Sequence, residues 1–180
     1  MVSNGKALRC ACNCSLYERL RIPAIHGDLG TGGAIMRGYA AIGLDNPKDP
    51  LNVGEVLRAC GCYQVAMLAV SGKRYKRAKT DTQKAYRHFP FIECDELKLI
   101  IPFDCVPVAV DLIEGATSLI DYVHPERAFY IFGAEDATLG KNTTKFCRDI
   151  IYIPTNHCMN LAATVNVVLY DRLSKQKGKS

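Results

Sequence analysis

Three short loops carry most of the side chains in this sequence that could bind a polar ligand or take part in catalysis. They are residues 45–52, 133–140 and 154–160. Each follows an apolar run that is expected to be a strand, and the last leads into an apolar helix at Asn160. The first N–H groups of a helix have no partner within that helix, so a polar ligand can dock there. The sequence therefore predicts a binding site where these loops meet.

A basic segment, GKRYKRAKTDTQKAYRH at residues 72–88, is the second chemical feature. Only Asp81 opposes its cations, and Tyr75 and Tyr86 are interleaved with them. Basic side chains contact phosphates and aromatic rings stack on bases, so this composition favours nucleic-acid contact over a merely solvated face. The residues predicted to make that contact are Lys73, Arg74, Lys76, Arg77, Lys79, Lys84 and Arg87.

The adjacent pair His157 and Cys158 raises the alternative of a thiol nucleophile. The members of a catalytic Cys–His couple usually come from separate elements of a fold, so adjacency argues against this alternative.

Residues 1–36 differ from the rest of the chain and are expected to be an irregular, cysteine-rich leader. Its glycines at 30, 32 and 33 do not form a dinucleotide loop, because Ile35 stands at the third glycine position and no strand precedes them. A zinc site is also disfavoured, because CxCxC is not the usual CxxC spacing. The residues that could form it are Cys10, Cys12, Cys14 and His26. We therefore expect a flexible tail without a metal, and Met36 is an alternative natural start.

Composition indicates one domain at residues 37–180. The chain has 180 residues, and 48% of them are hydrophobic, which is enough for a substantial core. No run approaches the roughly 20 apolar residues of a membrane helix, and the N-terminus lacks the apolar core of a signal peptide, so we expect a cytoplasmic protein. Its cysteines are then expected to be small buried hydrophobes rather than disulfide partners. Those in apolar settings are Cys60, Cys62, Cys94, Cys105 and Cys147.

Short apolar strands alternate with helices along this domain. Strands are expected at 39–44, 65–70, 89–94, 106–112, 128–133 and 150–153, and helices or helical turns at 52–60, 95–101, 115–123, 142–148 and 161–173. Asn52, with Glu55 three residues later, predicts a capped helix start, and Gly61 suits the helix end. This alternation predicts an α/β fold whose mostly parallel sheet has helices on both faces. Ligands of such sheets bind beyond the carboxyl ends of the strands, where the three loops lie.

The last helix is apolar nearly all round. Its apolar residues recur at helical spacing: Leu161, Ala162, Val165, Val168 and Leu169. Such a helix must be buried in a core or against a partner.

Three motifs in these loops resemble those of the SpoU/TrmH branch of the SPOUT RNA methyltransferases. They are NVGEVLR at 52–58, FGAEDATL at 132–139, and IPT followed by CMNL within 153–161. The resemblance covers about residues 37–173, with the motifs in the family's order. The chain is most similar to minimal members without an added RNA-binding domain, such as the tRNA wobble-ribose methyltransferases.

The resemblance implies a C-terminal trefoil knot that holds S-adenosylmethionine. It also implies a homodimer, with contacts from the final helix and residues 53–62, and methyl transfer to a ribose 2′-hydroxyl of tRNA or rRNA. The basic segment 72–88 would then grip RNA.

Site residues follow from the same resemblance. Arg58 is expected to orient the ribose and stabilise the developing alkoxide, because a guanidinium with a pKa above ~12 is a poor base. Asn52, Glu135 and Asn160 are expected to complete the catalytic site, with Glu135 holding Arg58 or Asn52. The expected cofactor contacts, mostly through backbone, are at Asp111, Gly133, Ile153, Cys158 and Met159.

The motifs depart from the family pattern at two positions. Thr138 stands where a glycine is usual and Cys158 where a serine is usual, and the last loop is short. These departures leave open a SPOUT-like protein that binds RNA without methylating it. A doubly wound nucleotide-binding protein of another kind is a more distant alternative, since no phosphate loop is present.

Overall fold

The computed structural model describes residues 38–72, 74, 87 and 89–177. The predicted leader, residues 1–36, lies outside the described residues. So do five of the predicted RNA-contacting residues: Lys73, Lys76, Arg77, Lys79 and Lys84.

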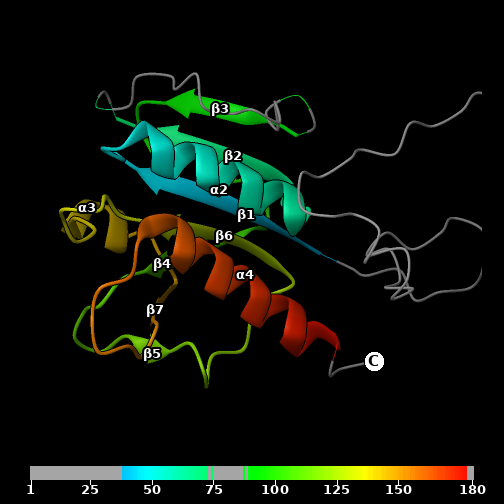
Figure 1. Cartoon of the computed structure of the whole chain (residues 1–180). Coiled ribbons are helices and arrows are strands. Elements are labelled where there is room, and N and C mark those ends of the chain that lie inside the picture. Colours follow the sequence, from blue (N-terminus) through cyan, green and yellow to red (C-terminus); the bar gives the residue numbers. More distant parts are fainter. Residues whose placement is uncertain (1–37, 73, 75–86, 88, 178–180) are drawn as a thin grey trace, which may run out of the picture. The chain divides into compact units, whose positions relative to one another are not determined.

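A seven-stranded sheet in the order β3-β2-β1-β6-β4-β7-β5 forms the centre of the domain (Figure 1). Its strands are β1 (Tyr39–Asp45), β2 (Met67–Ser71), β3 (Phe91–Cys94), β4 (Val106–Val110), β5 (Thr117–Ser118), β6 (Arg127–Phe132) and β7 (Asp149–Tyr152). Neighbouring strands of this sheet are parallel, which confirms the predicted α/β class. The strand β7 lies between β4 and β5, both of which precede it in the chain. The trefoil knot stays a prediction.

Both faces of the sheet are covered. Helices α2 (Pro50–Cys62) and α4 (Leu161–Lys177) lie side by side on one face (Figure 1). The 3-10 helix η2 (Leu97–Ile100) and the segment after the short helix α3 (Lys141–Thr144) pack on the other. Successive side chains of β6 point to opposite faces, because Tyr130 belongs to the core cluster that contains residues of α2 and α4, and Phe129 to the cluster that contains Leu97 of η2.

The start of α2 differs from the prediction. Asp49, not Asn52, is the N-cap, and its Oδ1 accepts a hydrogen bond of 2.8 Å from the backbone N–H of Leu51. Pro50 occupies the first turn, where its missing N–H costs nothing. Asn52 is thereby free to turn its buried side chain toward other loops. The helix also continues past Gly61 to Cys62.

Residues 115–123 were expected to be helical, and this was wrong. Thr117 and Ser118 form β5, which pairs in parallel with β7. The backbone N–H of Leu119 donates to the carbonyl of Tyr152 at 2.8 Å, so the β7 edge satisfies groups that a helix would have paired internally.

Helix α4 is buried along one face, which carries the apolar residues that the sequence predicted to be buried: Leu161, Ala162, Val165, Val168 and Leu169. Val165, Val168 and Leu169 are buried, whereas Tyr170 is 63% exposed. The expectation of a helix that is apolar nearly all round was wrong for the second half of α4, whose residues are mostly polar. One of these polar residues, Arg172, is nevertheless buried.

Hydrogen bonds clamp the second half of α4 to residues 119–127. Arg172 is 5% exposed and donates to the carbonyls of Pro125 (2.6 Å), Glu126 (2.6 Å) and Tyr39 (3.3 Å), and to the Tyr130 hydroxyl (3.2 Å). These bonds join the helix to the amino end of the sheet.

His124 is the second part of this clamp, and its side chain is 2% exposed. Its Nδ1 lies 2.6 Å from the Tyr130 hydroxyl, and its Nε2 lies 2.8 Å from Asp171 Oδ2. Because Arg172 already donates to that hydroxyl, the hydroxyl donates to Nδ1, and Nε2–H donates to Asp171. The network accommodates neutral His124, the form that the lowered pKa of this buried side chain favours.

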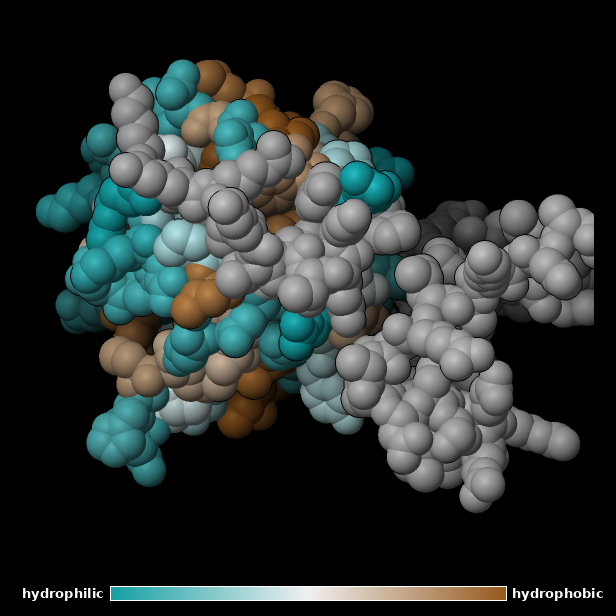
Figure 2. Space-filling model, turned by 45° about the horizontal axis from the view of Figure 1, so that its top comes forward, coloured by the Kyte–Doolittle hydropathy of each residue, from teal (hydrophilic) through white to brown (hydrophobic). Residues whose placement is uncertain are grey.

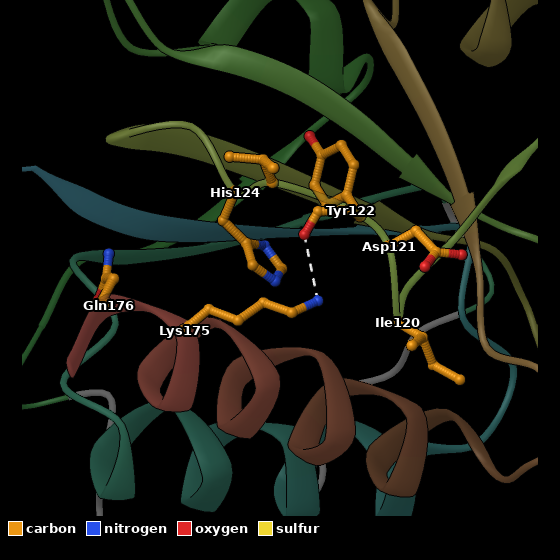
Figure 3. A pocket seen from close by; sticks show the side chains of 7 residues that line it. Ile120, Asp121, Tyr122, His124, Lys175 and Gln176 are labelled. Atoms are coloured by element: carbon orange, nitrogen blue, oxygen red, sulfur yellow. Dashed lines mark hydrogen bonds between the residues drawn. The ribbon is translucent and has the colours of Figure 1, made fainter. Parts of the chain in front are cut away.

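A pocket of about 280 Å³ opens beside this clamp (Figure 3). Lys175 crosses it from α4 and donates to the carbonyls of Leu119 (2.5 Å) and Tyr122 (3.1 Å), and it pairs with Asp171 at 2.8 Å. The ammonium group of Lys175 and the ring of His124 are thus engaged by neighbouring groups, and we assign the pocket a structural role.

Stability is expected to fall as the pH drops below about 6.5. Burial lowers the pKa of His124 from its ordinary 6.5, against the opposing effect of Asp171, so the unfolded chain takes up a proton before the folded one does. The groups facing it are Tyr122, Tyr130, Asp171, Arg172 and Lys175. The free energy of unfolding should then decrease by up to about 1.4 kcal/mol per pH unit, from about pH 6.5 down to the folded pKa.

Urea unfolding between pH 5 and 8 measures this dependence. His124→Gln should be less stable at pH 7 and should lose this part of the pH dependence, whereas His157→Gln, which changes an exposed histidine, should retain it. An unchanged slope in His124→Gln would show that other groups cause the dependence.

The cysteines that the structure describes are free thiols. Cys60 and Cys105 are buried and Cys94 and Cys147 partly so, as expected, but Cys62 is exposed at the end of α2. Burial raises the pKa of Cys147 to about 11, so its thiol stays protonated at neutral pH. Among the described helices, none has the length and apolar character needed to cross a membrane.

Candidate functional site

The three predicted loops meet at the carboxyl edge of the sheet, where three polar side chains form one chain of hydrogen bonds. Asn160 Nδ2 donates to Asn52 Oδ1 at 2.8 Å, and Asn52 Nδ2 donates to Glu135 Oε1 at 2.6 Å. In the sequence, Asn160 is 108 positions from Asn52, and Asn52 is 83 positions from Glu135. The fold thus brings together the polar residues of all three motifs.

The direction of this chain is set by the start of α4. Asn160 Oδ1 accepts from the backbone N–H groups of Ala162 (2.8 Å) and Ala163 (3.3 Å), which makes Asn160 the N-cap. Its Nδ2 must then be the donor to Asn52, whose own Nδ2 is left to donate to the carboxylate. The predicted capping role of Asn160 is present, and Asn52 links it to Glu135.

Glu135 is ionised at neutral pH. Partial burial would raise its pKa, but hydrogen bonds from Asn52 Nδ2 and from the backbone N–H groups of Glu135, Lys48 and Asp49 lower the pKa below its ordinary value. The Lys48 N–H lies 3.1 Å from Oε2, while Oε1 accepts from Asn52. A carboxylate so engaged is a weak base, so its chemistry here is to hold Asn52 and the β1–α2 loop.

Arg58 is not part of the hydrogen-bonded chain formed by Asn160, Asn52 and Glu135. It follows Asn52 by six positions in α2, which is about 9 Å along the axis and about 120° around it. Its side chain is exposed, in one stripe with Leu51, Glu55 and Cys62. No hydrogen bond or ion pair of Arg58 is found within the described residues. Glu135 therefore holds Asn52, and not Arg58.

The predicted cofactor residues follow three adjacent strands. Asp111 comes after β4, Gly133 after β6 and Ile153 after β7, and these strands are neighbours in the sheet. Asp111 accepts from the backbone N–H of Leu112 at 2.7 Å and of Leu139 at 2.5 Å. Its carboxylate thus ties the end of β4 to the loop 133–140, so its role at this edge is to shape that loop.

Gly133 and the loop before α4 are suited to a flat, partly apolar ligand. A Cβ at position 133 would lie 3.2 Å from the Ala137 carbonyl oxygen, so the chain turns back closely on itself there. Ile153 and Met159 are half-buried and Cys158 is exposed. Apolar side chains beside backbone polar groups are what an adenine needs, so these residues fit a nucleoside cofactor.

Arg74 is the one predicted RNA-contacting residue whose interactions at this edge are described. It donates two hydrogen bonds to Asp136, at 3.2 Å from Nη1 to Oδ1 and 2.8 Å from Nη2 to Oδ2. Lys48 Nζ lies 3.6 Å from the same carboxylate. Arg87 is exposed. Sequence analysis missed Lys48 and Asp136, and only their places in loops 45–52 and 133–140 could have indicated them.

The surface at this carboxyl edge, on the left in Figure 2, is predominantly hydrophilic. This agrees with a site open to a polar, charged ligand. The described residues hold no group of three or more His, Cys, Asp or Glu side chains that could bind a metal ion.

A family model matches most of this chain. The model described as the SpoU rRNA Methylase family matches residues 39–170, which include all three loops. No curated protein sequence gave a significant match.

Solved structures share the fold at low sequence identity. AviRb, a SpoU methyltransferase from Streptomyces viridochromogenes, is 17% identical with a TM-score of 0.71, covering 79% of this chain and 62% of that chain. A further AviRb structure contains the cofactor AdoMet. The A. aeolicus TrmH/SpoU tRNA modifying enzyme is 17% identical with a TM-score of 0.69, covering 80% of each chain.

The structure of a third protein, described as giving insights into 2-OH methylation of C/U34 on tRNA, is 19% identical with a TM-score of 0.66. The match covers 80% of this chain and 99% of that chain. The chain thus spans less than two thirds of AviRb but nearly the full length of this smaller protein.

Proposed function

Because this chain belongs to the SpoU rRNA Methylase family, we propose that it transfers a methyl group from S-adenosylmethionine to a ribose 2′-hydroxyl of tRNA or rRNA. The observation that carries the proposal is the hydrogen-bonded chain from Asn160 through Asn52 to Glu135 at the carboxyl edge. It fixes three loops in one arrangement beside the predicted cofactor residues. The match to the smaller protein whose structure concerns 2-OH methylation favours the ribose over the base.

S-adenosylmethionine supplies an already activated methyl group on its sulfonium sulfur. This chain would hold the cofactor through backbone groups at Gly133, Ile153, Cys158 and Met159, with the side chains of Ile153 and Met159 against the adenine. Asp111 contributes indirectly, because it fixes the loop 133–140 through Leu139.

The protein's remaining task is to align the hydroxyl and to stabilise the charge that develops on it. Arg58 is proposed for this role, since a guanidinium donates several hydrogen bonds and stays charged. Asn52, Glu135 and Asn160 would hold the loops in place. Glu135 is not proposed as the base, because its pKa is lowered and both of its oxygens accept hydrogen bonds.

A homodimer would cover the exposed stripes of α2 and α4. Arg58 lies in the exposed stripe of α2. On the outer side of α4, exposed Ala163 and Tyr170 recur at helical spacing with Val167, which is partly buried against the core. A second copy packed there would bury these side chains and bring Arg58 to an interface. We further propose that residues 37–180 form the methyltransferase domain and that the protein acts in the cytoplasm.

The alternative is a family member that binds RNA but no longer methylates it. Thr138, where a glycine is usual, lies in the exposed part of loop 133–140, and Cys158 replaces the usual serine. These changes lie next to the proposed cofactor contacts, so cofactor binding decides between the two functions.

Isothermal titration with S-adenosylmethionine and with S-adenosylhomocysteine is the test. Saturable binding of about one ligand per chain is expected, because the predicted pocket lies within one chain. ATP, which lacks the sulfonium or thioether side chain, is the control and should bind at least about tenfold more weakly. No binding at millimolar concentration of either ligand would contradict the enzyme and favour the RNA-binding alternative.

A further inference from the structure

Two cations from different loops converge on the carboxylate of Asp136. Arg74, which follows β2, makes the two hydrogen bonds given above, and Lys48, from the β1–α2 loop, lies 3.6 Å away. All three side chains are accessible, with exposed fractions of 36% for Arg74, 64% for Lys48 and 44% for Asp136. A ligand from solution can therefore reach the group.

Arg74 and Lys48 surround the Asp136 carboxylate as two cations would surround a bound phosphate. The planar guanidinium fork that binds a carboxylate with two parallel hydrogen bonds binds a phosphate in the same way. A lysine alongside adds a point charge. Exposed ion pairs contribute little to stability because water screens them, so an incoming phosphate can displace the carboxylate.

The group lies next to the proposed catalytic chain. Asp136 directly follows Glu135, and the backbone N–H of Lys48 donates to Glu135 Oε2 at 3.1 Å. If the reacting ribose lies beside Asn52 and Glu135, the phosphates that flank it in the RNA would lie toward Lys48 and Arg74. We propose that Lys48 and Arg74 clamp an RNA phosphate beside the reacting ribose, and that Asp136 occupies this clamp until RNA displaces it.

The inference rests on the proposed function, because it names the substrate group that the same edge would bind. It also has an electrostatic consequence. Displacement leaves the Asp136 carboxylate near a phosphate, and this repulsion opposes RNA binding. Removing the carboxylate charge should therefore strengthen RNA binding, whereas removing a residue that merely orders the loop should weaken it.

Filter binding of unfractionated tRNA, in the presence of S-adenosylhomocysteine to prevent turnover, tests the clamp. Asp136→Asn should tighten binding about 3- to 10-fold and steepen the plot of log affinity against log salt by up to about 1, because a cation becomes available to phosphate. Arg74→Gln should weaken binding. The loss caused by Arg74→Gln should be larger when Asp136 is already Asn, since Arg74 is then no longer neutralised.

Asp104→Asn is the matched control. Asp104 also pairs with an exposed arginine, Arg127, at 3.1 Å, but this pair lies at the amino edge of the sheet. Its replacement should leave tRNA affinity and salt dependence unchanged.

Unchanged or weaker tRNA binding by Asp136→Asn would overturn the inference, and so would an absence of tRNA binding by the wild type and both single variants. Cofactor titration separates this from the proposed function. If cofactor binds but Asp136→Asn has no effect on tRNA, only the clamp is wrong. If no cofactor binds and Asp136→Asn still tightens tRNA binding, the clamp stands and the methyl transfer does not.

Discussion

Alanine in place of Arg58 is expected to lower kcat for methyl transfer by at least about 100-fold, the usual effect of removing a group that stabilises transition-state charge. The structure makes this an informative substitution. Arg58 is exposed and makes no described hydrogen bond or ion pair, so its removal should change the free energy of unfolding by less than about 0.5 kcal/mol. Once size-exclusion chromatography has shown that the variant keeps the oligomeric state of the wild type, a loss of activity reports on chemistry and not on folding or assembly.

The measurement is transfer of a radiolabelled methyl group to tRNA and rRNA, with cofactor affinity measured in parallel. Arg58→Lys keeps the charge but loses the planar fork, and it should recover little activity. Arg127→Ala, an exposed arginine at the amino edge, should retain wild-type activity. Loss of cofactor binding in Arg58→Ala would contradict the role, because the arginine is assigned to the ribose and not to the cofactor.

Six of the seven strands, all except β5, could be predicted because each contains a short, mostly apolar run. The stretches 39–44 and 128–133 became β1 and β6, neighbours at the centre of the sheet. Once the strands were placed, their order with the intervening helices indicated a parallel sheet and put the polar loops at one edge. The family that the three loop motifs predicted is confirmed by the family model.

Contacts between loops that are far apart in the sequence could not be predicted from local sequence patterns. The sequence pattern predicted Asn52 as the N-cap of α2, but Asp49 is the N-cap. The Asn52 side chain does not cap the helix because its amide is hydrogen-bonded to Glu135 and Asn160 in other loops. In the same way, the edge of β7 drew Thr117 and Ser118 into a strand where local sequence favoured a helical turn. Local propensity is a weak prior, and partners supplied by the fold outweigh it.

The burial of Arg172 is the clearest feature that the sequence pattern could not predict. In the sequence it is a charge in the polar second half of an otherwise apolar helix, where a solvated position is the natural expectation. The fold buries it instead, because three backbone carbonyls and the Tyr130 hydroxyl converge on its guanidinium. Two of those carbonyls are 46 and 47 residues away in the sequence, so no helical periodicity could reveal them.

Replacing Arg172 with methionine is expected to lower the free energy of unfolding by about 3–5 kcal/mol, the cost of breaking a buried charge network by removing one partner. Methionine fills similar volume, so the loss comes mainly from carbonyls of Pro125 and Glu126 left without a donor, and not from a cavity. Urea unfolding followed by circular dichroism measures the change. Arg127→Ala, which removes an exposed pair with Asp104, should cost less than about 1 kcal/mol.

The Arg172→Met variant also tests whether the hydrogen bonds of Arg172 affect the candidate functional site at the other end of α4. Helix α4 carries Asn160 at its start and Arg172 in its second half, so a helix released at Arg172 also loosens the cap that holds Asn52. Below the unfolding transition, Arg172→Met should therefore bind S-adenosylmethionine more weakly, while Arg127→Ala should not. A loss below about 1 kcal/mol would mean that the apolar residues Val165, Val168 and Leu169 hold α4 largely by themselves, since each buried aliphatic side chain contributes about 1.5–3 kcal/mol.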